Sequence, residues 1–251
     1  MASRDDVLRE LHLAPLWRLR RREAAASVDD TPEPAGEGRA GNVVPLRPAD
    51  DAGARRARIA TLSWDALAGD IDACTACGLC RTRNRSVPGV GDRNARWLFV
   101  GEAPGADEDA RGEPFVGQAG KLLDNMLAAL GMNRQDGVYI ANVLKCRPPG
   151  NRTPEPLEAE ACRPYLERQI ELIRPALIVA LGRSAASLLL GTDATIASLR
   201  GRVHRWQSTP LVVTYHPAYL LRNLPDKAKA WEDLVFARRT AQAGTLTRSP
   251  A

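Results

Sequence analysis

The sequence predicts an α/β fold, in which a mostly parallel central sheet is flanked by helices on both faces. Two observations predict it. Short apolar runs of strand length alternate with longer segments of helical periodicity along most of the chain. Strands that alternate with helices need crossover connections, and these make neighbouring strands parallel. The chain has 251 residues, of which 44% are hydrophobic, so it can fill the core that such a sheet requires.

The predicted elements alternate strictly. In chain order they are strand 96–101, helix 120–130, strand 138–144, helix 158–173, strand 176–181, helix 184–190, strand 211–215 and helix 227–240. The strands are apolar runs such as R-W-L-F-V-G and A-L-I-V-A-L, which are typical of strands buried on both faces. The first helix is predicted because Leu123, Leu127 and Leu130 recur at the spacing of one helical face.

Composition divides the rest of the chain. Residues 1–23 contain a short basic amphipathic helix that Pro15 breaks or kinks, and we interpret them as an arm, either solvated or a docking peptide for a partner or DNA. Residues 24–57 are rich in Ala, Pro, Gly and charge, which predicts a disordered linker. The folded domain is predicted over residues 58–241, and a disordered tail over 242–251.

Charge and hydropathy limit the possible functions. The net charge is +5, a mild preference for polyanionic partners such as nucleic acid. No apolar run approaches the roughly 20 residues that span a bilayer, and the charged N-terminus lacks the apolar stretch of a signal peptide. We therefore expect a soluble, intracellular protein with no membrane partner. In that compartment the five cysteines are expected to be ligands or core residues, and not disulfides.

Four cysteines have the spacing of a metal site. Cys74 and Cys77 form a local C-x2-C pair, and Cys146 and Cys162 lie far downstream, so folding can close one site from two segments. Four thiolates suit either an iron–sulfur cluster or zinc, and the spacing does not separate these two. Cys80 adds a second, overlapping C-x2-C pair with Cys77, so that pair is an alternative.

Polar segments follow three of the predicted strands. They are G-E-A-P-G at 101–105, N-V-L-K-C-R-P-P at 142–149 and H-P-A-Y at 216–219. Ligands of parallel α/β sheets bind beyond the carboxyl ends of the strands. The three segments are therefore expected to form one site at one edge of the sheet.

These motifs resemble the family 4 uracil-DNA glycosylases, the iron–sulfur class of that superfamily. The matching stretches, in order, are C-T-A-C at 74–77, G-E-A-P-G-A-D-E-D at 101–109, G-E-P-F-V-G at 112–117, N-V-L-K-C-R-P-P-G-N-R at 142–152, Cys162 and H-P-A-Y-L-L-R-N at 216–223. Each motif alone is weak, but together and at these spacings they are specific. The resemblance covers roughly residues 70 to 240, and it leaves out the N-terminal arm.

The resemblance implies the roles of the pocket residues. His216 would stabilise the uracil oxygen O2 as it becomes anionic, and Asn142 would pair with the uracil edge through its donor and acceptor. Phe115 would stack on the extruded base. Gly101 and Ala103 would line the pocket. Glu102 would position or activate water, with Glu108 and Asp109 as alternatives.

The resemblance also implies DNA contacts and a cofactor. The enzyme would extrude the nucleotide from the duplex, with Leu220 or Leu221 as a wedge unless these side chains are core residues. Basic side chains beside the site would contact phosphates: Arg147, Arg152 and Arg222. The four ligands of a [4Fe–4S] cluster would be Cys74, Cys77, Cys146 and Cys162, with Cys80 a free thiol.

The expected function is removal of uracil from single- and double-stranded DNA in base-excision repair, by a monomer in the bacterial cytoplasm that works at the nucleoid. No lysine is placed as a Schiff-base nucleophile, so we expect no lyase step. The segment after Cys146 lacks histidine, so we expect ordinary turnover and no covalent attachment to DNA. The arm is expected to dock on a repair or replication protein. The alternative is a non-catalytic iron–sulfur or zinc module that binds nucleic acid.

Overall fold

The computed structural model describes residues 52–246. The predicted arm over 1–23 lies outside the described residues, as does most of the predicted linker. Two predicted boundaries are wrong. Helix α2 (Ala52–Ala60) begins inside the segment expected to be linker, because the buried side chain of Ile59 holds it on the domain. Helix α10 (Asp226–Leu246) continues five residues past the end predicted for the domain, 241.

A six-stranded sheet forms the centre of the described region, in the order β1-β3-β2-β4-β6-β5. The four predicted strands are its parallel core: β2 (Trp97–Gly101), β3 (Val138–Asn142), β4 (Leu177–Leu181) and β6 (Thr209–Thr214). The edges are β1 (Val90–Gly91) and β5 (His204–Trp206), both antiparallel to their neighbours. The sequence does not predict these edges because they are short and only partly buried.

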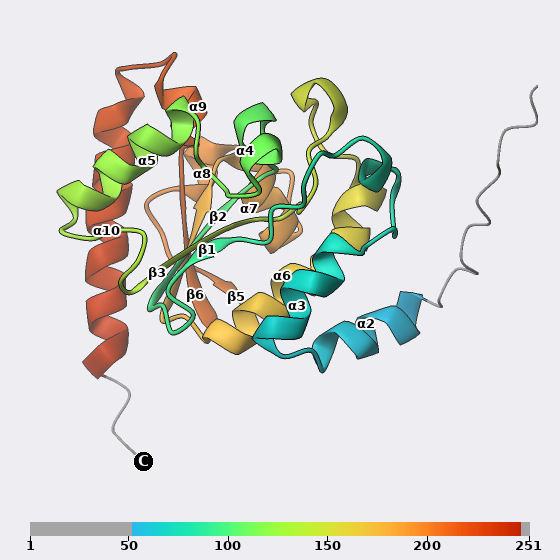
Figure 1. Cartoon of the computed structure of the whole chain (residues 1–251). Helices are drawn as coiled ribbons and strands as arrows, with labels where there is room; N and C mark the ends of the chain where they lie inside the picture. Colours follow the sequence, from blue (N-terminus) through green and yellow to red (C-terminus); the bar gives the residue numbers. More distant parts are fainter. Residues whose placement is uncertain (1–51, 247–251) are drawn as a thin grey trace, which may run out of the picture. The chain divides into compact units, whose positions relative to one another are not determined.

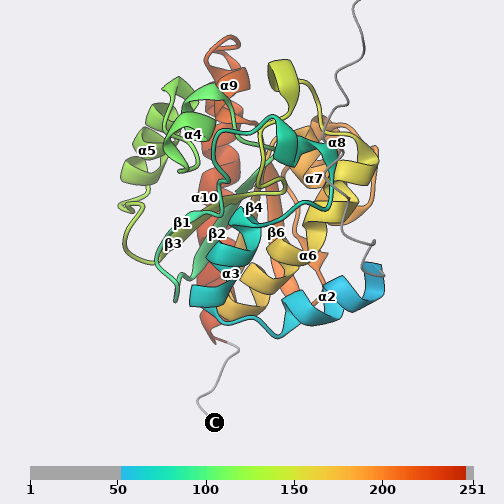
Figure 2. The ribbon, with the colours of Figure 1, turned by 45° about the vertical axis from the view of Figure 1, so that its right-hand side comes forward.

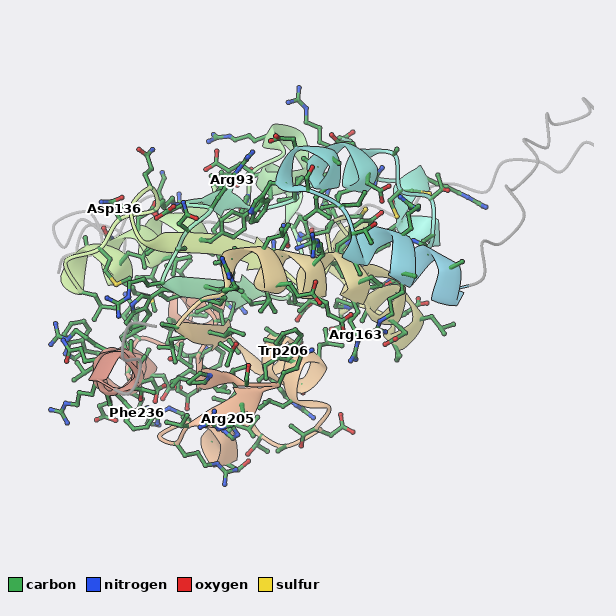
Figure 3. The ribbon with its side chains drawn as sticks, turned by 90° about the horizontal axis from the view of Figure 1, so that it is seen from below. Arg93, Asp136, Arg163, Arg205, Trp206 and Phe236 are labelled. Atoms are coloured by element: carbon green, nitrogen blue, oxygen red, sulfur yellow. The ribbon has the colours of Figure 1, made fainter. Side chains whose placement is uncertain are left out.

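Helices cover both faces, as predicted (Figure 1). On one face α6 (Pro156–Ile173) and α7 (Arg183–Leu190) pack against alternate strand residues such as Leu98. On the other face α5 (Gln118–Ala129) and α10 pack against the residues between, such as Phe99. Figure 3 shows the two layers with Arg163 on α6 and Phe236 on α10. Because both faces are buried, the strands contain little but apolar residues.

A third, smaller core lies beside the sheet. Here α2, α3 (Trp64–Asp72) and the 3₁₀ turn η1 (Gly78–Arg81) pack on α6, as Figure 2 shows for α2 and α3. Its buried side chains include Ile59, Tyr165 and two of the cysteines, Cys146 and Cys162. The N-terminal helices thus enclose the part of the chain that contains the cysteines.

Short helices complete the loops. They are α4 (Ala106–Arg111), η2 (Pro149–Asn151), α8 (Ile196–Leu199) and α9 (Pro217–Leu220). Helices α4 and α9 lie at the same end of the sheet, where the parallel strands finish (Figure 1). Elements of three to six residues are too short for an amphipathic pattern, so periodicity does not predict them. Among the described residues, no helix is both long enough and apolar enough to cross a membrane.

Candidate functional site

The three predicted strand-end segments meet at one edge of the sheet. Gly101 pairs with Asn142 across β2 and β3, and the N–H of Gly182 after β4 donates to the carbonyl of Thr214 at the end of β6 (2.8 Å). The side chains of Asn142 and Phe115 close over Gly101. A Cβ atom there would lie 2.4 Å from the Asn142 Oδ1 atom and 2.7 Å from the Phe115 ring. Only glycine leaves this space free.

Asn142 has an unused acceptor in this space. The residue is 2% exposed, and its Oδ1 atom has no hydrogen-bond partner among the described residues. Buried polar atoms are nearly always paired, because an unpaired one costs about 1–3 kcal/mol. The Oδ1 atom is therefore positioned for a donor that comes from a ligand.

His216 contributes a neutral imidazole to the same space. It is the N-cap of α9, where its Nδ1 atom accepts a hydrogen bond from the N–H of Ala218 (3.1 Å). Burial, together with the nearby positive charge of Arg222, lowers the pKa of His216 to about 4, and Glu108 opposes this weakly. Since Nδ1 accepts, the single proton of the neutral ring resides on Nε2. The ring thus offers one N–H donor.

Gly182 provides the space for His216, and sequence reasoning missed it. Its φ is +92°, and a Cβ atom would lie 2.9 Å from the Cβ of His216. The available signal was a glycine directly after the strand A-L-I-V-A-L, at the edge where ligands bind.

Phe115 lies beside both side chains, and a second missed residue holds it. The Phe115 ring is stacked on the His216 ring, with centroids 5.5 Å apart. Its backbone is in the left-handed region (φ +55°), which is rare for a residue with a side chain. The Arg134 guanidinium fixes this turn by donating to the carbonyls of Pro114 (2.9 Å) and Phe115. The positive charge of Arg134 gave no sequence signal for this role.

The structure distinguishes the three candidate carboxylates. Glu108 accepts backbone hydrogen bonds from Gly105 (3.0 Å), Val116 (2.9 Å) and Gly117 (3.1 Å), so it joins two loops of the site. Asp109 is buried and accepts two hydrogen bonds from Asn84, at 2.9 and 2.6 Å. The Glu102 side chain makes no hydrogen bond or ion pair within residues 52–246 and is partly exposed.

The residues predicted to contact DNA separate into two groups. Leu221 is 41% exposed, and Arg222 beside it is also exposed. Leu220 is 1% exposed, so as a wedge it is a wrong prediction: its side chain belongs to the core. Arg152 makes a two-pronged ion pair with Glu158 (2.9 and 2.6 Å) at the start of α6, which gives it a structural role.

Two further predicted residues, Arg147 and Ala103, contact other parts of the described structure. The Nε atom of Arg147 donates to Asn151 (2.7 Å) within the loop that precedes α6. Ala103 packs against the third core, which contains Cys146 and Cys162.

All five cysteines line one cavity between α3, η1 and α6. Three of their sulfur atoms accept a hydrogen bond: Cys74 from Arg55 (3.5 Å), Cys146 from Arg83 (2.9 Å) and Cys162 from the backbone N–H of Lys145 (3.2 Å). Within the described part of the chain, no donor contacts the Cys80 sulfur. The three contacted sulfurs all belong to the predicted ligand set.

Three cations border this cavity: Arg55, Arg83 and Lys145. Arg83 and Lys145 form no ion pair with a carboxylate of the described residues, and the acidic groups that act on them are cysteine side chains. Arg55, which contacts Cys74, also interacts electrostatically with Asp70. Lys145 is 1% exposed, and burial lowers its pKa to about 8. Cations are rarely buried without a counter-charge, so this cavity suits an anionic occupant.

Burial favours the neutral form of three of the thiols, Cys77, Cys146 and Cys162. Burial raises the pKa of Cys162 to about 12 and raises the pKa values of Cys77 and Cys146 as well. In residues 52–246 no group of three or more His, Cys, Asp or Glu side chains is arranged to hold a metal ion. A bound metal centre would have to displace these protons.

Comparison with known proteins gives consistent matches. Residues 88–235 match the family model described as the uracil DNA glycosylase superfamily. The type-4 uracil-DNA glycosylase of Archaeoglobus fulgidus is 50% identical over 167 residues, which are 63% of this chain and 83% of the relative. That of Saccharolobus solfataricus is 44% identical over 73% of this chain and 88% of its own. A type-5 uracil-DNA glycosylase of Thermus thermophilus is 39% identical over 65% of this chain and 74% of its own.

Proposed function

The chain belongs to the type-4 uracil-DNA glycosylases of the uracil DNA glycosylase superfamily, and from this membership we propose that it hydrolyses the bond between deoxyribose and uracil in DNA. The product is an abasic site, with which base-excision repair begins. The observation that supports this most directly is the unpaired Oδ1 atom of Asn142, buried beside Phe115 and His216.

The pocket has the groups that uracil needs. The Oδ1 atom of Asn142 would accept from uracil N3–H, and its Nδ2 atom would donate to O4. The Phe115 ring would stack on the base. The Nε2–H of His216 would donate to O2, where negative charge develops as the bond breaks. A fixed donor at that point stabilises the transition state more than the ground state.

Glu102 is the best placed carboxylate to position water. Its side chain has no structural partner within the described region, whereas Glu108 and Asp109 are occupied by loop hydrogen bonds. We assign no Schiff-base step, because Lys145 is enclosed between Asn142 and Gln169. The reaction is therefore proposed to end with base release.

The base has to leave the duplex to reach this pocket. We assign Leu221 as the side chain that enters the vacated position, because it is exposed in the segment after His216. The exposed guanidinium of Arg222 would contact a phosphate next to it.

We further propose that Cys74, Cys77, Cys146 and Cys162 hold a [4Fe–4S] cluster. Four thiolates and their cluster are anionic, and the cavity is lined by two cations, Arg83 and Lys145, that have no carboxylate partner among the described residues. When bound, the cluster would join the 74–80 and 146–162 segments.

The test is base release from an oligonucleotide with a single uracil, in single- and double-stranded form, read as alkali-labile cleavage. We expect cleavage by the wild type and a large loss in Asn142→Asp, whose carboxylate repels the uracil edge. The iron and zinc contents of the same preparation are measured. Retention of uracil-DNA without base release would favour the alternative, a binding module, and zinc in place of iron would refute the cluster.

A further inference from the structure

We propose that Lys145 is a positioning residue that fixes the main chain of Asn142 for uracil recognition and anchors it to the cysteine loop. The inference rests on the proposed function of Asn142. It assigns a task to a buried charged side chain that the reaction itself does not use.

The ammonium group of Lys145 makes two hydrogen bonds. Its Nζ atom donates to the main-chain carbonyl of Asn142 (2.7 Å) and to the Oε1 atom of Gln169 on α6 (2.6 Å). Gln169 is itself 1% exposed, and its Nε2 atom donates to the carbonyl of Pro88 (2.7 Å). The contact with the Asn142 carbonyl is thus separate from the contact with Gln169, which lies on α6.

The main chain of Lys145 contacts the cysteine cavity. Its N–H donates to the Cys162 sulfur (3.2 Å), its carbonyl accepts from the N–H of Val87 (2.8 Å), and the next residue is Cys146. One residue thus contacts Asn142 with its side chain and the cysteine cavity with its backbone.

The hydrogen bond from Lys145 to the Asn142 carbonyl lies where it can control the position of the Asn142 side chain. β3 ends at Asn142. The main-chain N–H groups of the next two residues donate to the main-chain carbonyls of Gly101 (3.0 Å) and Glu102 (3.0 Å). The Asn142 carbonyl turns toward Lys145, while its Oδ1 atom remains unpaired beside Gly101. A rotation of that peptide would move the Oδ1 atom. An apolar side chain would fill the same volume without the cost of burying a charge, but it could not fix the carbonyl.

The experiment is a double-mutant cycle on single-turnover uracil release, with Lys145→Met, Asn142→Ala and the double variant. If Lys145 acts through Asn142, Lys145→Met lowers the wild-type rate constant by about 100-fold, the loss expected for a misplacement of about 1 Å. In the Asn142→Ala background the same change should cost less than about threefold, because there is no side chain left to position.

Gln169→Met is the matched control, since it removes the other acceptor of the same ammonium group and leaves the Asn142 contact in place. Melting temperature and iron content are measured for every variant. We expect Gln169→Met to lose stability as Lys145→Met does, while its rate stays within about threefold of the wild type. Equal rate losses in the two variants, additive losses in the cycle, or an unchanged rate in Lys145→Met would overturn the inference.

A second readout does not depend on catalysis. The side-chain amide resonances of Asn142, identified by their absence in Asn142→Ala, should shift in Lys145→Met and remain in place in Gln169→Met. A wild type without base release would refute the proposed function, whereas unshifted Asn142 resonances would refute the positioning role. If Lys145→Met fails to fold, Lys145→Gln, which keeps a neutral donor, replaces it in both measurements.

Discussion

The ring of Phe115 stacks on the imidazole of His216, with centroids 5.5 Å apart and planes inclined by 29°. The two residues come from loops about 100 positions apart in the sequence. Each ring therefore limits the positions that the other can take. Phe115 is in addition held by its own left-handed backbone (φ +55°) and by Arg134, so the stack is fixed before any base arrives.

Replacing Phe115 by Leu should reduce uracil excision. Base–aromatic stacking contributes about 1–3 kcal/mol per base, so kcat/KM should fall by about 5- to 150-fold. Steady-state base release from single-stranded uracil-DNA measures this, because the duplex does not have to open. Phe236→Leu on α10 is the control, since that ring packs against the core on the α5 and α10 side of the sheet. Equal losses in both variants would argue against a stacking role.

The pH dependence of His216 has a defined direction. Its pKa is lowered from 6.5 to about 4, chiefly by burial. The folded state therefore binds this proton less readily than the unfolded state. The resulting stability is fully present above pH 6.5 and is lost as the pH falls toward 4. The neutral donor persists between pH 5 and 8, so His216 should add no inflection to the rate profile there.

Nitrogen-detected NMR of the imidazole checks the pKa directly, with the pH dependence of kcat measured beside it. A His216 titration near pH 6.5, or a rate limb at that pH that disappears in His216→Gln, would contradict the neutral assignment.

Gly101→Ala should abolish excision while the domain stays folded. The added Cβ atom would lie 2.4 Å from the Asn142 Oδ1 atom and 2.7 Å from the Phe115 ring, so it would displace the two side chains proposed to bind uracil. We expect the rate to fall by about 100-fold or more, as for a misplaced reacting group. Gly69→Ala in α3 is the control, because a Cβ atom there meets nothing within 4 Å. Retained activity in Gly101→Ala would place the base elsewhere.

Much of this pocket could be predicted from the sequence, because its main residues directly follow strands that are recognisable from local sequence. Buried parallel strands are continuous apolar runs, so β2, β3, β4 and β6 were recognisable, and the residues after them had to share one edge. Asn142 and His216 stand at these ends. The choice among Glu102, Glu108 and Asp109 could not be made from the sequence, because it depends on which loop amides a carboxylate meets.

The supporting residues were not predictable for a different reason. Arg55, Arg83 and Arg134 act through contacts with sulfur atoms or carbonyls that are distant in sequence. An arginine in a basic chain gives no sign of such a partner. Leu220 and Leu221 are adjacent and chemically identical, and only the turn of α9 buries one and exposes the other.

Glu102 and Glu108 should respond differently to the same substitution. Glu102→Gln should lower kcat by about 10²- to 10⁴-fold, the usual contribution of a general base, and leave the melting temperature unchanged, because the side chain has no structural partner in the described region. Glu108→Gln weakens three backbone hydrogen bonds between the loops, so it should lower the melting temperature. Thermal unfolding and single-turnover rates measured on both variants separate the roles. A destabilised Glu102→Gln with normal kcat would reverse the assignment.

The cysteine assignment predicts which thiol can be removed. The Cys74 sulfur accepts a hydrogen bond from Arg55, and Cys146 accepts one from Arg83, whereas no described donor contacts Cys80 in the same cavity. Such outer contacts orient metal ligands and are typically worth 10- to 100-fold in metal affinity. Cys80→Ser should therefore keep the wild-type iron content and visible absorbance, and Cys74→Ser should lose both.

Arg83→Gln extends this test to the cation itself. It leaves all five thiols in place but removes the donor to Cys146 and one of the positive charges beside the proposed anionic cluster. Iron release to a chelator should become about tenfold faster. Arg81→Gln, on the exposed end of η1, is the matched control and should release iron at the wild-type rate. Iron loss in Cys80→Ser with retention in Cys74→Ser would instead make Cys77 and Cys80 the local ligand pair, and Arg55 would then contact a thiol outside the ligand set.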